Sequence, residues 1–199
     1  MPLVNFTARE ITCKLVYCGP GRCGKTTNLQ YVHGRVPAGR RGEMLSLATH
    51  GDRTLFFDFL PLDLGKISGF STRFQLYTVP GQIYYAATRR LVLQGADGVV
   101  FVADSQARRF DENLESLQDL QDNLLDQGVD VRAFPLVFQY NKQDLPSELI
   151  LPPSSLDDSL NFRGVPSFPA DALRGSGVFE TLRAISALVL ERLSARVAT

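Results

Sequence analysis

Hydrophobic and polar residues follow two different periods along this chain, which predicts strands that alternate with helices. Short apolar runs between Gly, Pro or polar residues predict strands at 11–18, 54–60, 70–79, 96–104, 134–140 and 165–168. Apolar positions three or four residues apart predict helices at 111–127 and 178–193. A further helix is expected from about residue 24 to 35, where Pro37 and Gly39 then break it, and a short one at 87–93. An alternating stretch at 4–6 predicts an extra N-terminal strand. This order implies an α/β fold with three layers, in which helices cover both faces of a mostly parallel sheet.

The segments between these elements are predicted to be loops. Residues 37–52 are rich in Gly, Arg and Ser and have no clear period, so we expect a long functional loop there. Residues 65–69 are expected to be a turn between two antiparallel strands. A second loop begins at 79–82, and 146–161, rich in Pro, Ser, Asp and Leu, is expected to be a connector.

Length, composition and charge favour a single globular domain and give no support for a nucleic-acid-binding or membrane-spanning protein. We expect one domain over residues 1–199, with a hydrophobic content of 44% that suffices for a substantial core. The 21 basic and 21 acidic residues cancel, so nothing favours nucleic acid as a partner, and Arg40 and Arg41 are expected to be solvated. No apolar run approaches the ~20 residues of a membrane span. The start does not resemble a signal peptide and the usual lipidation motifs are missing, so we expect a cytoplasmic monomer without a lipid anchor.

Cysteine and histidine suggest no metal centre. Cys13 and Cys18 lie five apart on one predicted strand, hence on opposite faces, and we expect reduced, buried thiols. His33 and His50 have no carboxylate or cysteine at ligand spacing. The phenylalanines at 56, 57 and 59 place aromatic rings on both faces of a strand. One face belongs to the core, whereas the other either docks a partner or lies under a neighbouring loop.

The segment 19–26, GPGRCGKT, fits the P-loop pattern G-x-x-x-x-G-K-[ST] between a predicted strand and a predicted helix. Glycines let successive backbone N–H groups point into one concavity, and the helix adds the positive end of its dipole. The lysine of such a loop reaches the β- and γ-phosphates, and the hydroxyl after it ligates Mg²⁺. The expected nucleotide contacts are Gly19, Pro20, Gly21, Arg22, Cys23, Gly24, Lys25, Thr26 and Thr27.

The segment 141–144, NKQD, directly follows a strand that is predicted to be buried. Asp144 is placed to accept hydrogen bonds from the N1–H and the exocyclic amine of guanine, a pair of donors that adenine does not present. Asn141 is expected to bridge the base site and the P-loop, while the stem of Lys142 lies over the base. The chain is therefore predicted to bind GTP and GDP.

P-loop, threonine-bearing loop, P-G-Q and N-K-x-D occur in the order that is typical of the Ras-like small GTPases, which this chain resembles over nearly its whole length. The runs GEMLSLAT at 42–49, RTLFFDFLPL at 53–62 and LYTVPGQ at 76–82 resemble more closely the bacterial MglA type of that family. The resemblance implies a Ras-like G domain, a GTPase activity that is slow alone, and roles in cell polarity and in gliding or type IV pilus motility. It also implies a roadblock-fold activating partner of the MglB type, further effectors, and recruitment to a cell pole.

The resemblance also assigns roles to single residues. Thr26 and Thr54 would ligate Mg²⁺, and Gln82 would orient the attacking water. The Gly81 N–H would contact the γ-phosphate, and Arg53 would be an arginine finger supplied in cis, although a solvated loop arginine is the alternative. The last base-contacting loop is placed at 171–173, where only a backbone contact from Ala172 is expected.

One position departs from the usual Ras-like pattern. Where most Ras-like proteins carry the Asp of Asp-x-x-Gly-Gln, this chain has Thr78, as MglA-type proteins do. Magnesium thereby loses a negative partner, and Asp52 or Asp58 is the hypothesised replacement. This substitution keeps open a rival function, a nucleotide-gated scaffold with negligible hydrolysis. A small-molecule P-loop kinase is disfavoured by the NKQD segment.

Overall fold

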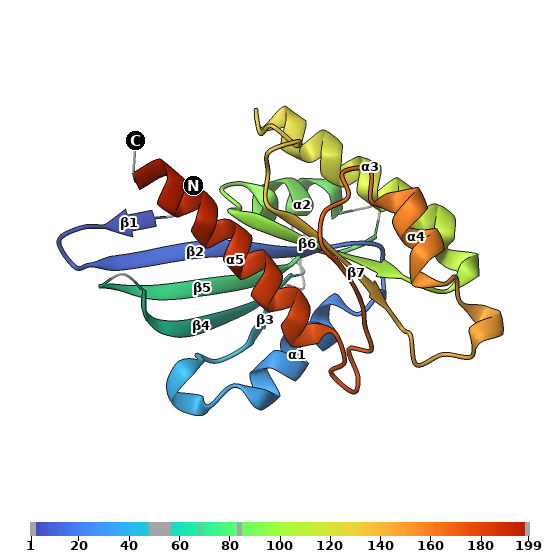
Figure 1. Ribbon diagram of the computed structural model, residues 1–199, viewed down its shortest axis with the longest axis horizontal. Helices are drawn as coiled ribbons and strands as arrows, with labels where there is room; N and C mark the ends of the chain where they lie inside the picture. Colours follow the sequence, from blue (N-terminus) through green and yellow to red (C-terminus); the bar gives the residue numbers. More distant parts are fainter. Residues whose placement is uncertain (1–2, 48–56, 68, 83–84, 198–199) are drawn as a thin grey trace.

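The computed structural model describes residues 3–47, 57–67, 69–82 and 85–197, and these form one twisted sheet with helices on both faces (Figure 1). The sheet has eight strands in the order β3-β4-β5-β2-β6-β7-β8, and β1 pairs with β2 beside this path. The strands are β1 Leu3–Asn5, β2 Glu10–Cys18, β3 Leu45–Leu47, β4 Phe57–Ile67, β5 Phe70–Thr78, β6 Gly98–Asp104, β7 Leu136–Asn141 and β8 Ser167–Pro169.

Strand direction divides the sheet. From β5 through β8 every neighbouring pair is parallel, whereas β1 with β2, β3 with β4, and β4 with β5 are antiparallel. All residues of β6 and β7 are buried, as expected for parallel strands that helices cover on both faces. The carboxyl ends of β2, β6 and β7 consequently meet at one edge, where ligands bind in sheets of this kind.

In the described part of the chain, five α-helices form the two outer layers. They are α1 Lys25–Arg35, α2 Ala86–Leu93, α3 Phe110–Asp126, α4 Pro153–Leu160 and α5 Val178–Val197. One buried cluster joins α1 and α5 to the sheet, for example through Leu29 and Ile185. A second cluster joins α2, α3 and α4 to the opposite face, for example through Leu120 and Leu156. The predicted fold class, including the extra N-terminal strand, is confirmed.

Three segments differ from the prediction. The expected loop at 37–52 contains a 3-10 turn at Ala38–Arg40 and the strand β3, which forms because Leu45–Leu47 pairs with β4. The strand predicted at 54–60 continues as β4 to Ile67, so 65–67 is strand and not turn; residues 54–56 lie outside the described part. Pro61 removes no hydrogen bond to β5, because its carbonyl, and hence its nitrogen, faces the other side of β4, where the carbonyl accepts from the Gly42 N–H at 3.0 Å. A bulge follows between Asp63 and Gly65.

The expected connector at 146–161 contains a short 3-10 turn, Ser147–Leu149, and the helix α4. Pro153 begins this helix, a position where proline costs no hydrogen bond. Leu156 and Leu160 are one turn apart and fully buried, so tertiary packing stabilises a helix whose short pattern is weak in the sequence.

The cysteines behave as predicted. Cys13, Cys18 and Cys23 are free and buried, and Cys13 and Cys18 belong to the two different core clusters on opposite faces of the sheet.

Phe57 and Phe59 share one face of β4, where both rings pack against the ring of Tyr77, with centroids 5.9 and 4.9 Å apart. No helix among the described residues is long and apolar enough to cross a membrane.

Candidate functional site

The loop between β2 and α1 has the backbone of an anion cradle. Gly19 and Gly24 have φ of +135° and +104°, values that side chains rarely allow. A Cβ on Gly19 would lie 2.1 Å from the carbonyl oxygen of Val102 on β6, so the loop passes directly over the neighbouring strand. Arg22 adopts φ of +63° although it is not a glycine. The sequence pattern thus coincides with the strand–loop–helix geometry that phosphate binding requires.

Lys25 supplies a buried positive charge to this loop. Its side chain is buried, and Nζ donates to the carbonyl oxygens of Gly19 and Pro20 at 2.8 and 2.6 Å. The ammonium group therefore lies over the loop, at the N-terminus of α1, where the helix dipole also favours an anion. Thr26 and Thr27 follow in the first turn of the same helix.

Asn141, the last residue of β7, joins the P-loop to the loop that precedes α5. Its Nδ2 donates to the Cys23 carbonyl at 2.7 Å, and its Oδ1 accepts from the Ala172 N–H at 2.9 Å. A Cβ on Gly24 would lie 2.1 Å from this Nδ2. The structure therefore brings Asn141 together with the P-loop and with the segment around Ala172, and it commits the Ala172 N–H to Asn141.

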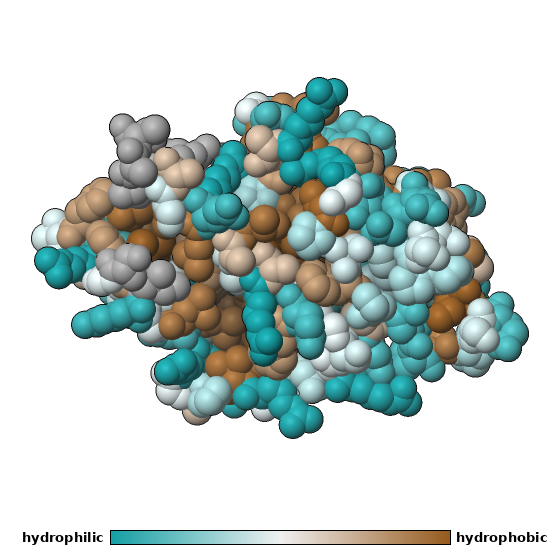
Figure 2. All heavy atoms as spheres, in the orientation of Figure 1, coloured by the Kyte–Doolittle hydropathy of each residue, from teal (hydrophilic) through white to brown (hydrophobic). Residues whose placement is uncertain are grey.

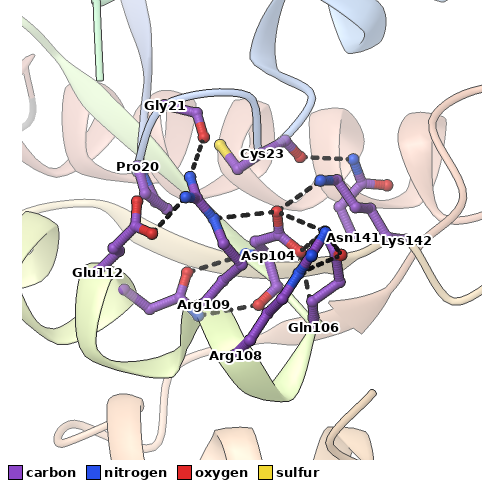
Figure 3. A network of polar contacts seen from close by, with 12 residues as sticks. Pro20, Gly21, Cys23, Asp104, Gln106, Arg108, Arg109, Glu112, Asn141 and Lys142 are labelled. Carbon is purple, nitrogen blue, oxygen red and sulfur yellow. Dashed lines mark hydrogen bonds and ion pairs between the residues drawn. The ribbon is translucent and has the colours of Figure 1, made fainter. Parts of the chain in front are cut away.

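Lys142 bends away from the strand with φ of +73°, and its Nζ donates to Oδ2 of Asp104 at 2.5 Å (Figure 3). Asp104 ends β6 and is completely buried. Asp144 is exposed, just beyond the end of β7. Sequence reasoning named Lys142 and Asp144 and missed Asp104, which stood at the end of an apolar run where a buried strand meets the ligand edge.

Arg109 was also missed by sequence reasoning. It precedes α3, and Nη2 of its guanidinium donates to the Gly21 carbonyl of the P-loop at 2.6 Å. Nη1 contacts the carboxylate of Glu112, and Nε lies 3.9 Å from Oδ2 of Asp104 (Figure 3). Nothing in the sequence around 108–109 distinguishes this arginine from its neighbour, because the partner loop is 88 residues away.

A cavity of about 470 Å³ opens beside the P-loop, lined among others by Thr26, Asp58 and Gln82. Asp58 on β4 is buried, and three hydroxyl groups donate to it. Its Oδ2 accepts from Thr26 Oγ1 at 2.5 Å and from Thr78 Oγ1 at 2.9 Å, and its Oδ1 accepts from Ser46 Oγ at 2.7 Å. The Asp58 N–H in turn donates to Thr78 Oγ1 at 2.8 Å. A carboxylate is therefore placed directly beside Thr26 and Thr78.

The oxygens in this cavity suit a magnesium ion better than a softer metal. Mg²⁺ prefers oxygen ligands, keeps several waters, and is held in nucleotide sites by one or two protein groups together with phosphates. Within the described residues, no three His, Cys, Asp or Glu side chains form a cluster able to hold a metal by themselves. Thr26 and Asp58 offer a hydroxyl and a carboxylate at one wall of the cavity, and this donor set fits Mg²⁺.

The segment after β5 lies against the P-loop. A Cβ on Gly81 would lie 2.3 Å from the Gly21 nitrogen, so only glycine fits there without backbone movement. Gln82 is exposed and lines the same cavity. Arg89 of α2, which pairs with Asp119 of α3 at 2.8 Å, donates to the Gln82 carbonyl at 2.6 Å and so connects this segment to the helical layer.

Some predicted site residues lie outside the described part of the chain. These are Asp52, Arg53 and Thr54. His50, which is not expected to bind a metal, also lies outside the described part. His33 lies in α1, outside any metal-binding cluster of the described residues. The structure therefore brings together the P-loop, Asn141, Ala172, Thr78, Gly81 and Gln82, together with Asp58, one of the two carboxylates hypothesised from the sequence. It adds Asp104 and Arg109.

A comparison with known proteins finds a similar protein over almost the whole chain. The chain is 54% identical over 193 residues to the mutual gliding-motility protein MglA of Myxococcus xanthus (strain DK1622). The match covers 97% of this chain and 98% of that protein. No family model matches the chain.

Proposed function

The chain belongs to the MglA-type Ras-like small GTPases, and from this premise we propose that it is a molecular switch that binds GTP or GDP with Mg²⁺ and hydrolyses GTP. The observation that carries the proposal is the pair of hydrogen bonds of Asn141, which join the P-loop to the segment around Ala172. Phosphate cradle and base site are thereby parts of one continuous structure. Asp144 selects guanine, and the stem of Lys142 packs on the base.

The phosphates are bound by the P-loop amides and Lys25, with the contacts of Gly19 to Thr27 assigned above. Thr26, Thr54 and Asp58 would hold Mg²⁺. Asp58 would supply the carboxylate that most Ras-like proteins have at the position of Thr78. When bound, the ion would offset charge on the transferring phosphoryl group. The hydrogen bonds between Asp58, Thr26 and Thr78 support this assignment. Gly81 contributes its N–H to the γ-phosphate, Gln82 orients the attacking water, and Arg53 contributes positive charge in cis.

The partners follow the relative's name and the resemblance. The similar protein is named for gliding motility, and we extend to this chain a role in polarity and in gliding or type IV pilus movement. A roadblock-fold protein of the MglB type is the proposed activating partner. Since Arg53 supplies the arginine, this partner acts by ordering the catalytic residues. Gln82→Leu and Arg53→Ala are each expected to nearly abolish partner-stimulated turnover and to leave GDP binding intact.

Titration with Mg²⁺ tests the metal assignment. We expect the wild type to release fluorescent GDP slowly in Mg²⁺ and quickly in EDTA, and we expect Asp58→Asn to require at least about tenfold more Mg²⁺ for the slow rate. Asp63→Asn, on the same strand but away from the cavity, is the matched control. An unchanged Mg²⁺ requirement in Asp58→Asn refutes the role of this carboxylate.

Specificity and hydrolysis are tested separately. Excess GDP should displace the fluorescent nucleotide while ADP does not, and Asp144→Ala should abolish this preference. A single-turnover assay with GTP distinguishes the switch from a scaffold that binds without hydrolysis. No measurable phosphate release with or without a roadblock partner would favour the scaffold.

A further inference from the structure

The P-loop of this chain contains one residue in a strained conformation. Arg22 has φ of +63°, in the left-handed region that glycine occupies readily and other residues rarely. A backbone in this conformation persists only where its surroundings hold it. The peptide that leads into Arg22 carries the Gly21 carbonyl, and that carbonyl is the group to which Arg109 donates at 2.6 Å.

Arg109 is itself held on two sides. Its Nη1 contacts Glu112 one turn further along α3, and its Nε lies 3.9 Å from the fully buried carboxylate of Asp104. The same oxygen of Asp104 accepts from Lys142 Nζ at 2.5 Å. Figure 3 shows this chain of contacts from Gly21 through Arg109 and Asp104 to Lys142. A guanidinium with several donors in fixed geometry suits such a position better than a flexible ammonium group.

The planarity of the peptide bond tells where the Arg22 N–H points. In a trans peptide the C=O and the following N–H point in opposite directions, and the described chain contains no cis peptide. Arg109 lines a second cavity of about 720 Å³ on the α3 side of the loop, together with Pro20 and Glu115. Gly21 and Arg22 line both cavities, whereas Arg109 does not line the 470 Å³ cavity beside Lys25 and Thr26. Because Arg109 holds the carbonyl on the α3 side, the Arg22 N–H is directed away from it, toward the phosphate cradle.

We propose that Arg109 is a positioning residue for nucleotide binding, which holds the Gly21–Arg22 peptide so that the Arg22 N–H serves as a phosphate donor. Arg109, which fixes this donor, and Lys142 of the base site both contact the carboxylate of Asp104. Phosphate and base contacts are thereby coupled by side chains outside the P-loop and NKQD motifs. The inference rests on the proposed nucleotide binding.

Nucleotide release and phosphorus NMR test the role of Arg109. Arg109→Ala is expected to release fluorescent GDP at least about tenfold faster than the wild type, because a charge-assisted hydrogen bond and the loop geometry are lost. It is also expected to shift the phosphorus-31 resonances of bound GDP. Arg108→Ala is the matched control, because this neighbouring guanidinium bonds only to the Gln106 side chain among the described residues. Arg109→Lys keeps the charge without the forked geometry and is expected to lie between the two.

Arg22→Gly separates positioning from a general structural role. Glycine adopts positive φ without strain, so in the Arg22→Gly background Arg109→Ala should accelerate release only about threefold or less. The Arg109→Lys variant serves in the same cycle if Arg109→Ala does not fold. An equal acceleration in both backgrounds, unchanged phosphorus resonances, or equal release from Arg109→Ala and Arg108→Ala overturns the inference. Absence of nucleotide binding in wild type and Arg108→Ala would instead count against the proposed function.

Discussion

The two sides of the candidate site satisfy their polar groups in different ways. On the base side, defined by Asn28, Gln139, Asn141 and Thr181, every side chain is buried and bonds to another part of the core. On the cavity side, defined by Ser46, Asp58 and Thr78, the carboxylate and the hydroxyls bond chiefly to one another beside an open space of about 470 Å³. The hydrogen bonds of the base side therefore fix one arrangement of its side chains. On the cavity side the carboxylate and hydroxyl oxygens are available as ligands for a metal ion.

Buried hydrogen bonds explain the difference. Gln139 of β7 exchanges two hydrogen bonds with Asn28 of α1, at 2.8 and 3.0 Å, and donates to Thr181 of α5 at 3.1 Å. A polar group of this kind costs free energy when its partner is removed, because no water replaces it. On the cavity side Ser46 is exposed, and Asp58 and Thr78, although buried, line the open cavity. Water or a ligand can therefore replace a lost partner there at lower cost.

The largest expected effect comes from breaking the base side at Gly24. In Gly24→Ala the new Cβ would meet Asn141 Nδ2 at 2.1 Å, and φ of +104° is unfavourable for alanine. We expect the free energy of unfolding to fall by about 3 kcal/mol and GDP binding to be lost. Gly34→Ala is the control, since this helical glycine has open space around it, and it should stabilise the protein by about 0.5–1 kcal/mol. Urea unfolding measures both; a mild effect of Gly24→Ala would contradict the tight approach of Asn141.

A pair of substitutions compares the two sides directly. Gln139→Leu deprives Asn28 and Thr181 of buried partners and should lower the free energy of unfolding by about 2 kcal/mol. Ser46→Ala removes one donor to Asp58 from an exposed position and should cost less than about 0.5 kcal/mol. Urea unfolding without nucleotide gives both values. Equal costs would mean that the two sides do not differ in the way described.

The comparison also requires that water is excluded from the core beneath both sides. The pH dependence of stability above pH 9 tests this, because it reports on the buried cysteine thiols. Burial raises the pKa of Cys13 and that of Cys18 from 9.0 to about 12, with the nearby Asp97 contributing to the shift of Cys13. Unfolded thiols ionise above pH 9 while the folded ones stay protonated, so the free energy of unfolding falls as pH rises from 9 toward 12. Each thiol contributes about 1.4 kcal/mol per pH unit in this window. Between pH 8 and pH 10, the free energy of unfolding measured in urea should therefore fall less in Cys13→Ala and in Cys18→Ala than in the wild type. An equal fall in the wild type and both variants would indicate that the thiols are hydrated in the folded state.

The smallest effect distinguishes partnered from unpartnered hydroxyls. Within the described residues the buried Tyr17 hydroxyl has no hydrogen-bond partner, whereas the Tyr140 hydroxyl donates to Asp157 at 2.7 Å. Tyr17→Phe should therefore raise the free energy of unfolding by up to about 1 kcal/mol, and Tyr140→Phe should lower it by about 1 kcal/mol. Thermal melting resolves the two signs. A loss of stability in Tyr17→Phe would indicate an ordered water at that hydroxyl.

Much of the fold could be predicted from the sequence because it depends on local patterns. The apolar runs of β6 and β7, the helical spacing of α3 and the glycine loop before α1 each lie within one short segment. The short helix α4 and the strand β3 were missed, because both depend on partners that the local sequence does not reveal. Leu156 and Leu160 of α4 are buried against the sheet, and Leu45–Leu47 exists as a strand only through β4.

The sequence by itself determined the phosphate loop, the NKQD segment and the alternation of strands and helices, since each is a property of consecutive residues. Only the tertiary structure decided which carboxylate stands beside Thr78. The antiparallel register that pairs Phe59 with Tyr77 brings Asp58 next to Thr78, twenty residues away. The tertiary structure also decided that Arg109, and not Arg108, reaches Gly21. The direction of a side chain at the start of α3 depends on how the helix packs against the sheet. Register and packing are set by contacts between distant segments, and no spacing rule within one segment encodes them.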